Sequence, residues 1–119
     1  MHQVIISLAS NYQQEENLSE AKACLRQILF SEKYTRAIWT VPFNGKGSSL
    51  YLNQLVYADT DLSVEDLNRQ LKQFEKQMGR CEDDRQKGIV KVDLDLLLYD
   101  DQRYHHKDWD RPYIKELLL

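Results

Sequence analysis

The chain has 119 residues, a length that fits one small domain with its own hydrophobic core, so we expect a single domain over residues 1–119. Charged residues make up 29% of the chain and the formal net charge is −3, which argues against a nucleic-acid partner or an anionic membrane surface. The two cysteines, Cys24 and Cys81, lack CxxC spacing, and the first residues lack a basic or long apolar leader. Composition therefore predicts a cytoplasmic protein with reduced thiols.

The first half of the chain alternates strand and helix patterns. Residues 3–8 are an aliphatic run of strand length, and a polar loop follows through Asn17. An apolar stripe at three- and four-residue spacing then predicts an amphipathic helix; its members are Leu18, Ala21, Leu25, Ile28 and Leu29. Residues 33–41 are β-rich and predict a second strand, residues 42–49 an open loop with proline and glycine, and residues 51–58 a third strand.

The second half opens with the clearest helix signal. Ser63 followed by Asp66 resembles a capping box, and Gly79 is typical of a helix end. Between them runs an apolar stripe of Val64, Leu67, Leu71, Phe74 and Met78. Residues 79–88 predict a charged loop, and residues 112–119 a short helical turn.

Two aspartates, Asp93 and Asp95, interrupt an apolar run that ends at Tyr99. Residues two apart on a strand share one face, so both carboxylates are expected side by side. Such a pair fits a divalent cation that also contacts substrate phosphates. The alternative is a solvated strand face on which Lys91 neutralises one acid. The pattern alone leaves both interpretations open.

The predicted order is strand, helix, strand, strand, helix, strand. Two amphipathic helices must bury their stripes, and packing both on one face of a four-stranded antiparallel sheet does so. We therefore expect an α+β, ferredoxin-like βαββαβ fold. In it the first and third strands lie at the centre of the sheet, with the fourth beside the first.

Five short motifs share their order and spacing with one known family. They are residues 6–11 (Ile-Ser-Leu-Ala-Ser-Asn), 40–43 (Thr-Val-Pro-Phe), 51–53 (Tyr-Leu-Asn), Glu75 with 79–80 (Gly-Arg), and 93–97 (Asp-Leu-Asp-Leu-Leu). Through them nearly the whole chain resembles the 6-hydroxymethyl-7,8-dihydropterin pyrophosphokinases, folate-pathway enzymes that move a pyrophosphoryl group from ATP to a pterin alcohol.

The resemblance implies functional roles for residues in several of these motifs and for two lysines near them. Asp93 and Asp95 would hold two Mg²⁺ ions on the ATP phosphates, and with Arg80 they would form the catalytic group. Arg80, Lys87 and Lys91 would lie on the ATP side. The pterin would contact a further set of residues: Thr40, Pro42, Phe43, Tyr51 and Asn53.

Several positions depart from the family pattern, and they lie mainly on the ATP side. Basic or small residues expected before the first aspartate are replaced by Gln86, Ile89 and Val90, and an expected arginine by Glu82. The family's Pro-His-Tyr becomes Pro-Tyr-Ile at residues 112–114, and the sequence ends at Leu119, before the segment expected to carry the second aromatic wall of the pterin site. A one-sided aromatic stack is therefore expected.

Three functions remain open on the sequence. The first is pyrophosphoryl transfer with a rebuilt ATP site, and the second is pterin or metal binding without catalysis. The third, a palm-like nucleotidyl-transfer domain, gives no role to Thr40, Tyr51 and Asn53. The adjacent histidines His105 and His106 are expected to be solvated.

Overall fold

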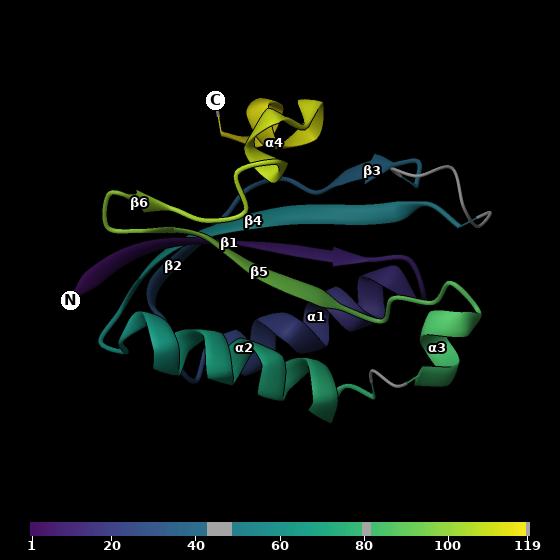
Figure 1. Ribbon diagram of the computed structural model, residues 1–119, viewed down its shortest axis with the longest axis horizontal. Helices are drawn as coiled ribbons and strands as arrows, with labels where there is room; N and C mark the ends of the chain where they lie inside the picture. The colour runs from purple at the N-terminus through teal and green to yellow at the C-terminus, as the bar shows by residue number, and fades with distance from the viewer. Residues whose placement is uncertain (43–48, 80–81, 119) are drawn as a thin grey trace.

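The computed structural model describes residues 1–42, 49–79 and 82–118, apart from the side chains of Glu82 and Arg85. Its elements follow one another along the chain as shown in Figure 1. They are β1 (His2–Ser10), α1 (Gln14–Leu25), β2 (Phe30–Tyr34), β3 (Ile38–Thr40), β4 (Tyr51–Thr60), α2 (Val64–Gln77), α3 (Glu82–Gln86), β5 (Asp93–Tyr99), β6 (Gln102–Arg103), a 3-10 turn (Asp108–Asp110) and α4 (Pro112–Leu117).

The sheet has the expected central arrangement. Its order is β2-β4-β1-β5-β6, with β3 also paired to β4, and every pairing is antiparallel. The first strand therefore lies between the third and fourth strands that the sequence predicts. The α+β, ferredoxin-like fold is confirmed.

The expectation of four strands is wrong, because the sheet has six. One additional strand arises where the predicted strand over residues 33–41 divides into β2 and β3. Between them the Thr35 hydroxyl accepts the Leu55 N–H at 3.1 Å, a position that a strand carbonyl would otherwise take. The other is β6, which forms a short hairpin with the end of β5. The predicted loop over residues 79–88 likewise contains a short helix, α3.

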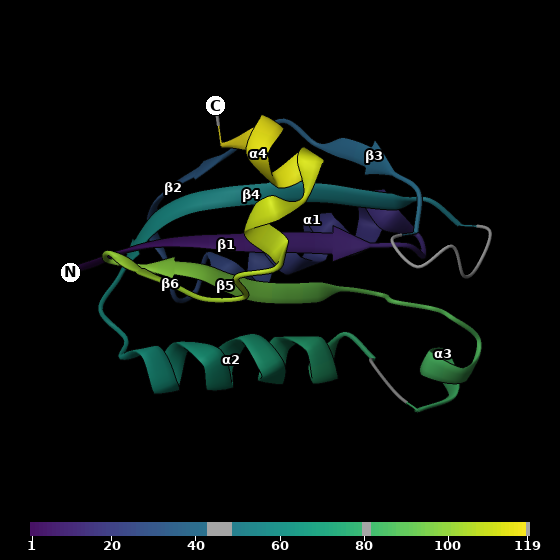
Figure 2. The ribbon, with the colours of Figure 1, turned by 45° about the horizontal axis from the view of Figure 1, so that its top comes forward.

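Helices α1 and α2 cover one face of the sheet, as expected (Figures 1 and 2). The buried apolar side chains of both helices form the main core with one face of β1, β4 and β5. The Ser63 hydroxyl accepts the Asp66 N–H at 3.1 Å, and Gly79 ends the segment with φ 91°, so both predicted helix signals are confirmed. Helix α1 ends earlier than its stripe, so that Ile28 and Leu29 lie beyond it.

In the described part of the chain, the opposite face of the sheet carries α4 and the 3-10 turn before it (Figure 2). A smaller core joins this helix to the strands through Ile5, Leu55, Leu97, Ile114 and Leu117. The predicted helical turn near the C-terminus is thus confirmed as α4. Because α4 is short, it leaves part of this face uncovered, and the candidate site lies there.

Candidate active site

A cavity of about 920 Å³ opens beside α4 on this face of the sheet. Side chains from β1, β3, β4, β5 and α4 contribute to its wall. The cavity brings together six of the residues that the sequence singled out: Thr40, Pro42, Tyr51, Asn53, Asp93 and Asp95. Residues from distant parts of the chain therefore share one site.

The floor of the cavity follows from strand register. Asn53 of β4 is opposite Ala9 of β1, and Ala9 is opposite Asp93 of β5. In the neighbouring row, Ser7 is opposite Asp95. The small side chains of β1 leave space between the amide and the carboxylates. Because two strand spacings separate Asn53 from Asp93, these backbones lie about 10 Å apart.

Asp93 and Asp95 lie on one face, as the strand alternation predicted, and both line the cavity. The Asp95 side chain is only 17% exposed. Burial, and then the neighbouring Asp93 carboxylate, raises the pKa of Asp95 to about 6. A negative charge on Asp95 is therefore unfavourable, and a bound cation would offset this cost.

The carboxylate pair fits an Mg²⁺ site whose other ligands would come from water and substrate phosphates. Among the residues that the structure describes, no group of three or more His, Cys, Asp and Glu side chains has the arrangement of a metal site. Mg²⁺ commonly binds through one or two carboxylates and completes its shell with water and substrate phosphates. Asp93 and Asp95 are both partly buried and would supply that minimal protein contribution, and metal binding by this pair stays a prediction.

Asn53 is 2% exposed and its amide joins two strands. Its Nδ2 group donates to the Thr40 hydroxyl at 2.8 Å and to the Ile38 carbonyl at 3.1 Å. These bonds fix β3 against β4 at the cavity wall. Asn53 thus has a structural role that the sequence did not reveal, in addition to its place in the cavity.

The cavity also includes residues that sequence reasoning did not assign to it. Tyr113 of α4 lines the wall, together with Arg111, which begins that helix. The one-sided stack expected from the sequence stays a prediction, although a second ring, that of Tyr113, lines the cavity together with Tyr51. Burial raises the pKa of the Tyr113 phenol. The helix-start pattern at Pro112 predicts α4, but no local pattern predicts which strand face the helix covers.

Arg111 and two acids from the C-terminal segment complete the charged part of the wall. Arg111 forms an ion pair with Asp108 at 3.2 Å, and Glu116 pairs with Arg36 at 3.3 Å. Arg36 lies between β2 and β3, so this pair connects α4 to the edge of the sheet.

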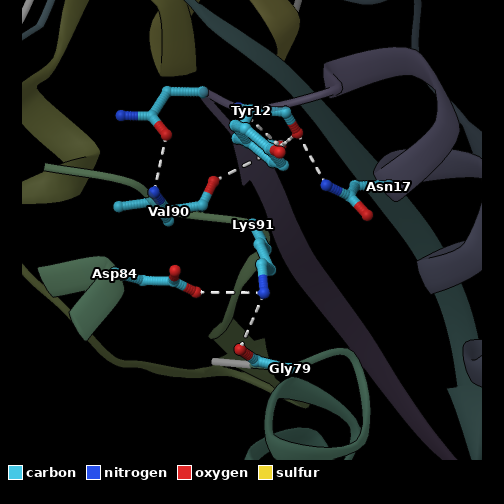
Figure 3. Close-up of polar contacts among 8 residues, drawn as sticks. Tyr12, Asn17, Gly79, Asp84, Val90 and Lys91 are labelled. Carbon is cyan, nitrogen blue, oxygen red and sulfur yellow. Dashed lines mark hydrogen bonds and ion pairs between the residues drawn. The ribbon is translucent and has the colours of Figure 1, made fainter. Parts of the chain in front are cut away.

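The two lysines expected on the ATP side do not line this cavity. Lys91 Nζ lies 3.2 Å from Asp84 and donates to the Gly79 carbonyl at 3.1 Å (Figure 3). Lys87 is exposed beyond the end of α3. Their contact with nucleotide stays a prediction.

The segment that enters β5 is fixed to the turn after β1. Val90 donates its N–H to the Asn11 side chain at 2.6 Å and accepts the Asn11 N–H at 2.9 Å. Asn11 also donates to the Gly88 carbonyl at 2.8 Å. These contacts give the Asn11 motif a role in holding the segment that leads to Asp93.

Two other predicted site residues, Phe43 and Arg80, lie outside the described residues, as does the side chain of Glu82.

Among the described residues, no helix is both long enough and apolar enough to cross a membrane.

The chain is similar to two plant proteins. It is 30% identical over 127 residues to a mitochondrial folate synthesis bifunctional protein of Pisum sativum, covering 98% of this chain and 24% of that protein. It is 28% identical over 122 residues to a folate synthesis bifunctional protein of Arabidopsis thaliana, covering 94% and 25%. The chain thus spans about a quarter of the length of these relatives.

The family comparison covers almost the whole chain. A family model described as 7,8-dihydro-6-hydroxymethylpterin-pyrophosphokinase matches residues 5–119. This range contains the aspartate pair, the Asn53 strand and the α4 segment. The chain belongs to the 7,8-dihydro-6-hydroxymethylpterin-pyrophosphokinase family.

Proposed function

We propose that this chain transfers a pyrophosphoryl group from ATP to 6-hydroxymethyl-7,8-dihydropterin, a step of folate biosynthesis. The observation that carries the proposal is the single cavity that joins Tyr51 and Asn53 to Asp93 and Asp95. Family membership supports the same reaction. Family membership gives no support to the alternative of a palm-like nucleotidyl-transfer domain.

The pterin would occupy the part of the cavity between β3, β4 and α4. Tyr51 and Tyr113 offer aromatic faces to a flat bicyclic ring, and stacking on such faces is favourable. Asn53 and Thr40 lie where they would form hydrogen bonds with the polar edge of the ring. Since Asn53 donates to Thr40 and Ile38, the amide is already oriented before the pterin binds. A pre-oriented group loses little entropy on binding.

The pterin hydroxymethyl group would then point along the sheet toward β5. Asn53 and Asp93 lie two strands apart, about 10 Å, which leaves room for the ring and its side chain between them. In the reaction the hydroxyl oxygen forms a bond to the β-phosphorus of ATP. The bond from that phosphorus to the α–β bridging oxygen breaks, AMP leaves, and the hydroxyl proton is released.

Asp93 and Asp95 would hold Mg²⁺, two ions in our proposal, beside the nucleotide phosphates. When bound, this metal supplies neutralisation of phosphate charge and alignment of the reacting groups. The protein contributes the position of the two carboxylates. Partial burial and the neighbouring Asp93 carboxylate make the charge of Asp95 costly without a cation, which favours cation binding.

The test is AMP formation from ATP by the native chain in the presence of Mg²⁺ and 6-hydroxymethyl-7,8-dihydropterin, separated by chromatography. We expect pterin-dependent AMP release that Asp95→Asn reduces by at least about a hundredfold, in line with loss of a charged group that positions phosphate. Asp101→Asn, an exposed aspartate outside the cavity, is the matched control. Absence of pterin-dependent AMP from the native chain, or equal rates for the two variants, would contradict the proposal.

The relatives are bifunctional proteins about four times as long, so any second activity or partner of a longer protein is a separate question. The cytoplasmic location predicted from composition stays a prediction, and the pea relative is named as mitochondrial.

A further inference from the structure

Two basic side chains approach the same carboxylate oxygen of Asp95. Lys72 Nζ, from α2, lies 3.9 Å from Asp95 Oδ1, and His105 Nε2 lies 3.7 Å from it. The sequence predicted no role for Lys72 and a solvated position for His105. Because Asp95 also lines the cavity, these two groups stand at the border of the candidate active site.

Lys72 reaches this position around an edge of the sheet. Strand β6 pairs only with Leu98 and Tyr99, so residues 93–96 have no strand on that side in the described part of the chain. Helix α2 lies along this edge, and the buried Glu75 carboxylate accepts the Leu94 N–H there at 2.8 Å. Lys72, one turn earlier, also lies 3.4 Å from Glu75. The lysine is therefore held between two carboxylates.

His105 is placed by a constrained backbone. Its φ is 54°, in the left-handed region that non-glycine residues enter at a cost, although histidine enters it more often than most. Its carbonyl accepts the Asp108 N–H at 2.8 Å, which closes a tight turn after β6. The turn directs the ring to Asp95, and the ring remains 47% exposed, so a ligand can reach it.

The cavity wall has more acidic than basic side chains, so Lys72 and His105 would matter for binding a negatively charged nucleotide. Among the described lining residues, the acids are Asp93, Asp95, Asp108 and Glu116, and the basic residue is Arg111. Arg111 is paired with Asp108, and Lys91 with Asp84. A triphosphate that approaches acids of this kind needs cations beside them. Lys72 and His105 are the basic groups in contact with Asp95 itself.

We propose that Lys72 and His105 are phosphate-binding residues of the candidate active site. This inference rests on the proposed function. In the nucleotide-free chain the two groups offset the charge of Asp95. Once a divalent cation neutralises Asp95, they are released to bind the phosphate oxygens of the nucleotide. Lys72 then provides a positive charge and His105 a ring N–H donor on the β5 side of the site.

The experiment measures binding of the α,β-methylene analogue of ATP and of inorganic tripolyphosphate, both with Mg²⁺, by calorimetry. Charge-assisted hydrogen bonds of about 1.5–3 kcal/mol correspond to about 10–150-fold in affinity. Since both groups are exposed, we expect Lys72→Met and His105→Asn each to weaken both ligands by about 5–20-fold, near the lower end. Asparagine is used because it tolerates the left-handed backbone.

Matched controls separate this effect from general loss of charge. Lys76→Met removes an exposed lysine one turn further along α2, and His106→Asn removes the adjacent exposed histidine. Both are expected to bind like the native chain. Lys72→Arg keeps the positive charge and is expected to retain most of the affinity. This variant still tests the inference if Lys72→Met fails to fold because the buried Glu75 carboxylate has lost its lysine partner. Raising the salt concentration is expected to weaken binding less in Lys72→Met than in the native chain.

The outcomes are distinct. If Lys72→Met and His105→Asn bind tripolyphosphate as tightly as their controls, the inference is wrong, whether or not AMP forms. If both variants lose affinity but the native chain releases no AMP, the inference stands and the proposed reaction fails. If the native chain binds no polyphosphate with Mg²⁺, both are overturned.

Discussion

Glu75 accepts a 2.8 Å hydrogen bond from the backbone N–H of Leu94, the residue between Asp93 and Asp95. The bond runs from α2 to the edge of β5 and satisfies a backbone donor for which the described strands provide no acceptor. Glu75 is only 3% exposed, so the contact is sheltered from water. It couples the position of the two aspartates to the packing of α2.

The first prediction follows from this contact. Glu75→Ala leaves the Leu94 N–H without its acceptor, so we expect it to lower the free energy of unfolding by about 2–3 kcal/mol. Glu75→Gln keeps a carbonyl acceptor and should cost about 1 kcal/mol or less. Urea unfolding measures both, with the exposed Gln73→Ala on the same helix as the control. Equal costs for the alanine and glutamine variants would show that the hydrogen bond does not matter.

The second prediction concerns the raised pKa of Asp95. In the folded chain it is about 6, against an ordinary value of 3.8, so the folded state binds this proton more tightly than the unfolded state. Stability in the presence of EDTA therefore falls as the pH rises through this window, and the penalty is complete above about pH 6.

Asp95→Asn removes that penalty. We expect the variant to be more stable than the native chain by about 1–3 kcal/mol near pH 7.5, and equally stable near pH 4. The lower end of the range allows for loss of the exposed pairs with Lys72 and His105. Urea unfolding in EDTA at several pH values measures the difference. If the stability difference does not change with pH, the ionised form of Asp95 does not destabilise the folded state.

The third prediction is the response to metal. Mg²⁺ at about ten times its Kd is expected to raise the melting temperature of the native chain by roughly 3–5 °C, because it binds only the folded state. Asp93→Asn and Asp95→Asn should abolish this rise, whereas Asp101→Asn should keep it. Calorimetry at constant ionic strength excludes simple screening. If all variants respond as the native chain does, the carboxylates do not bind metal.

Local sequence patterns accounted for much of this architecture. Alternation placed Asp93 and Asp95 on one face, and the Ser63 cap marked the start of α2 correctly. These features depend on residues two to four positions apart, within the range where backbone geometry alone determines neighbours. The order of the central strands followed from the handedness of their connections.

The features that the sequence did not predict depend on contacts between distant segments. The division into β2 and β3 depends on Thr35, whose hydroxyl bonds to Leu55 on another strand. The position of Tyr113 depends on which sheet face α4 covers. Likewise, Lys72 reaches Asp95 around the edge of β5, where the described residues provide no further strand, and His105 reaches it from the turn after β6. No spacing along the chain encodes such contacts.

The last prediction tests the second aromatic wall. Tyr51→Ala and Tyr113→Ala are each expected to weaken binding of 6-hydroxymethyl-7,8-dihydropterin by about 3–10-fold, since an aromatic contact contributes about 0.5–1.5 kcal/mol. Tyr113→Phe keeps the ring and removes only the hydroxyl, so it should bind nearly as the native chain does. Titration of pterin fluorescence measures affinity, and Tyr57→Ala, an exposed β4 tyrosine outside the cavity, is the control. If Tyr51→Ala weakens binding but Tyr113→Ala does not, the pterin stacks on one ring, and Tyr113 only closes the cavity wall.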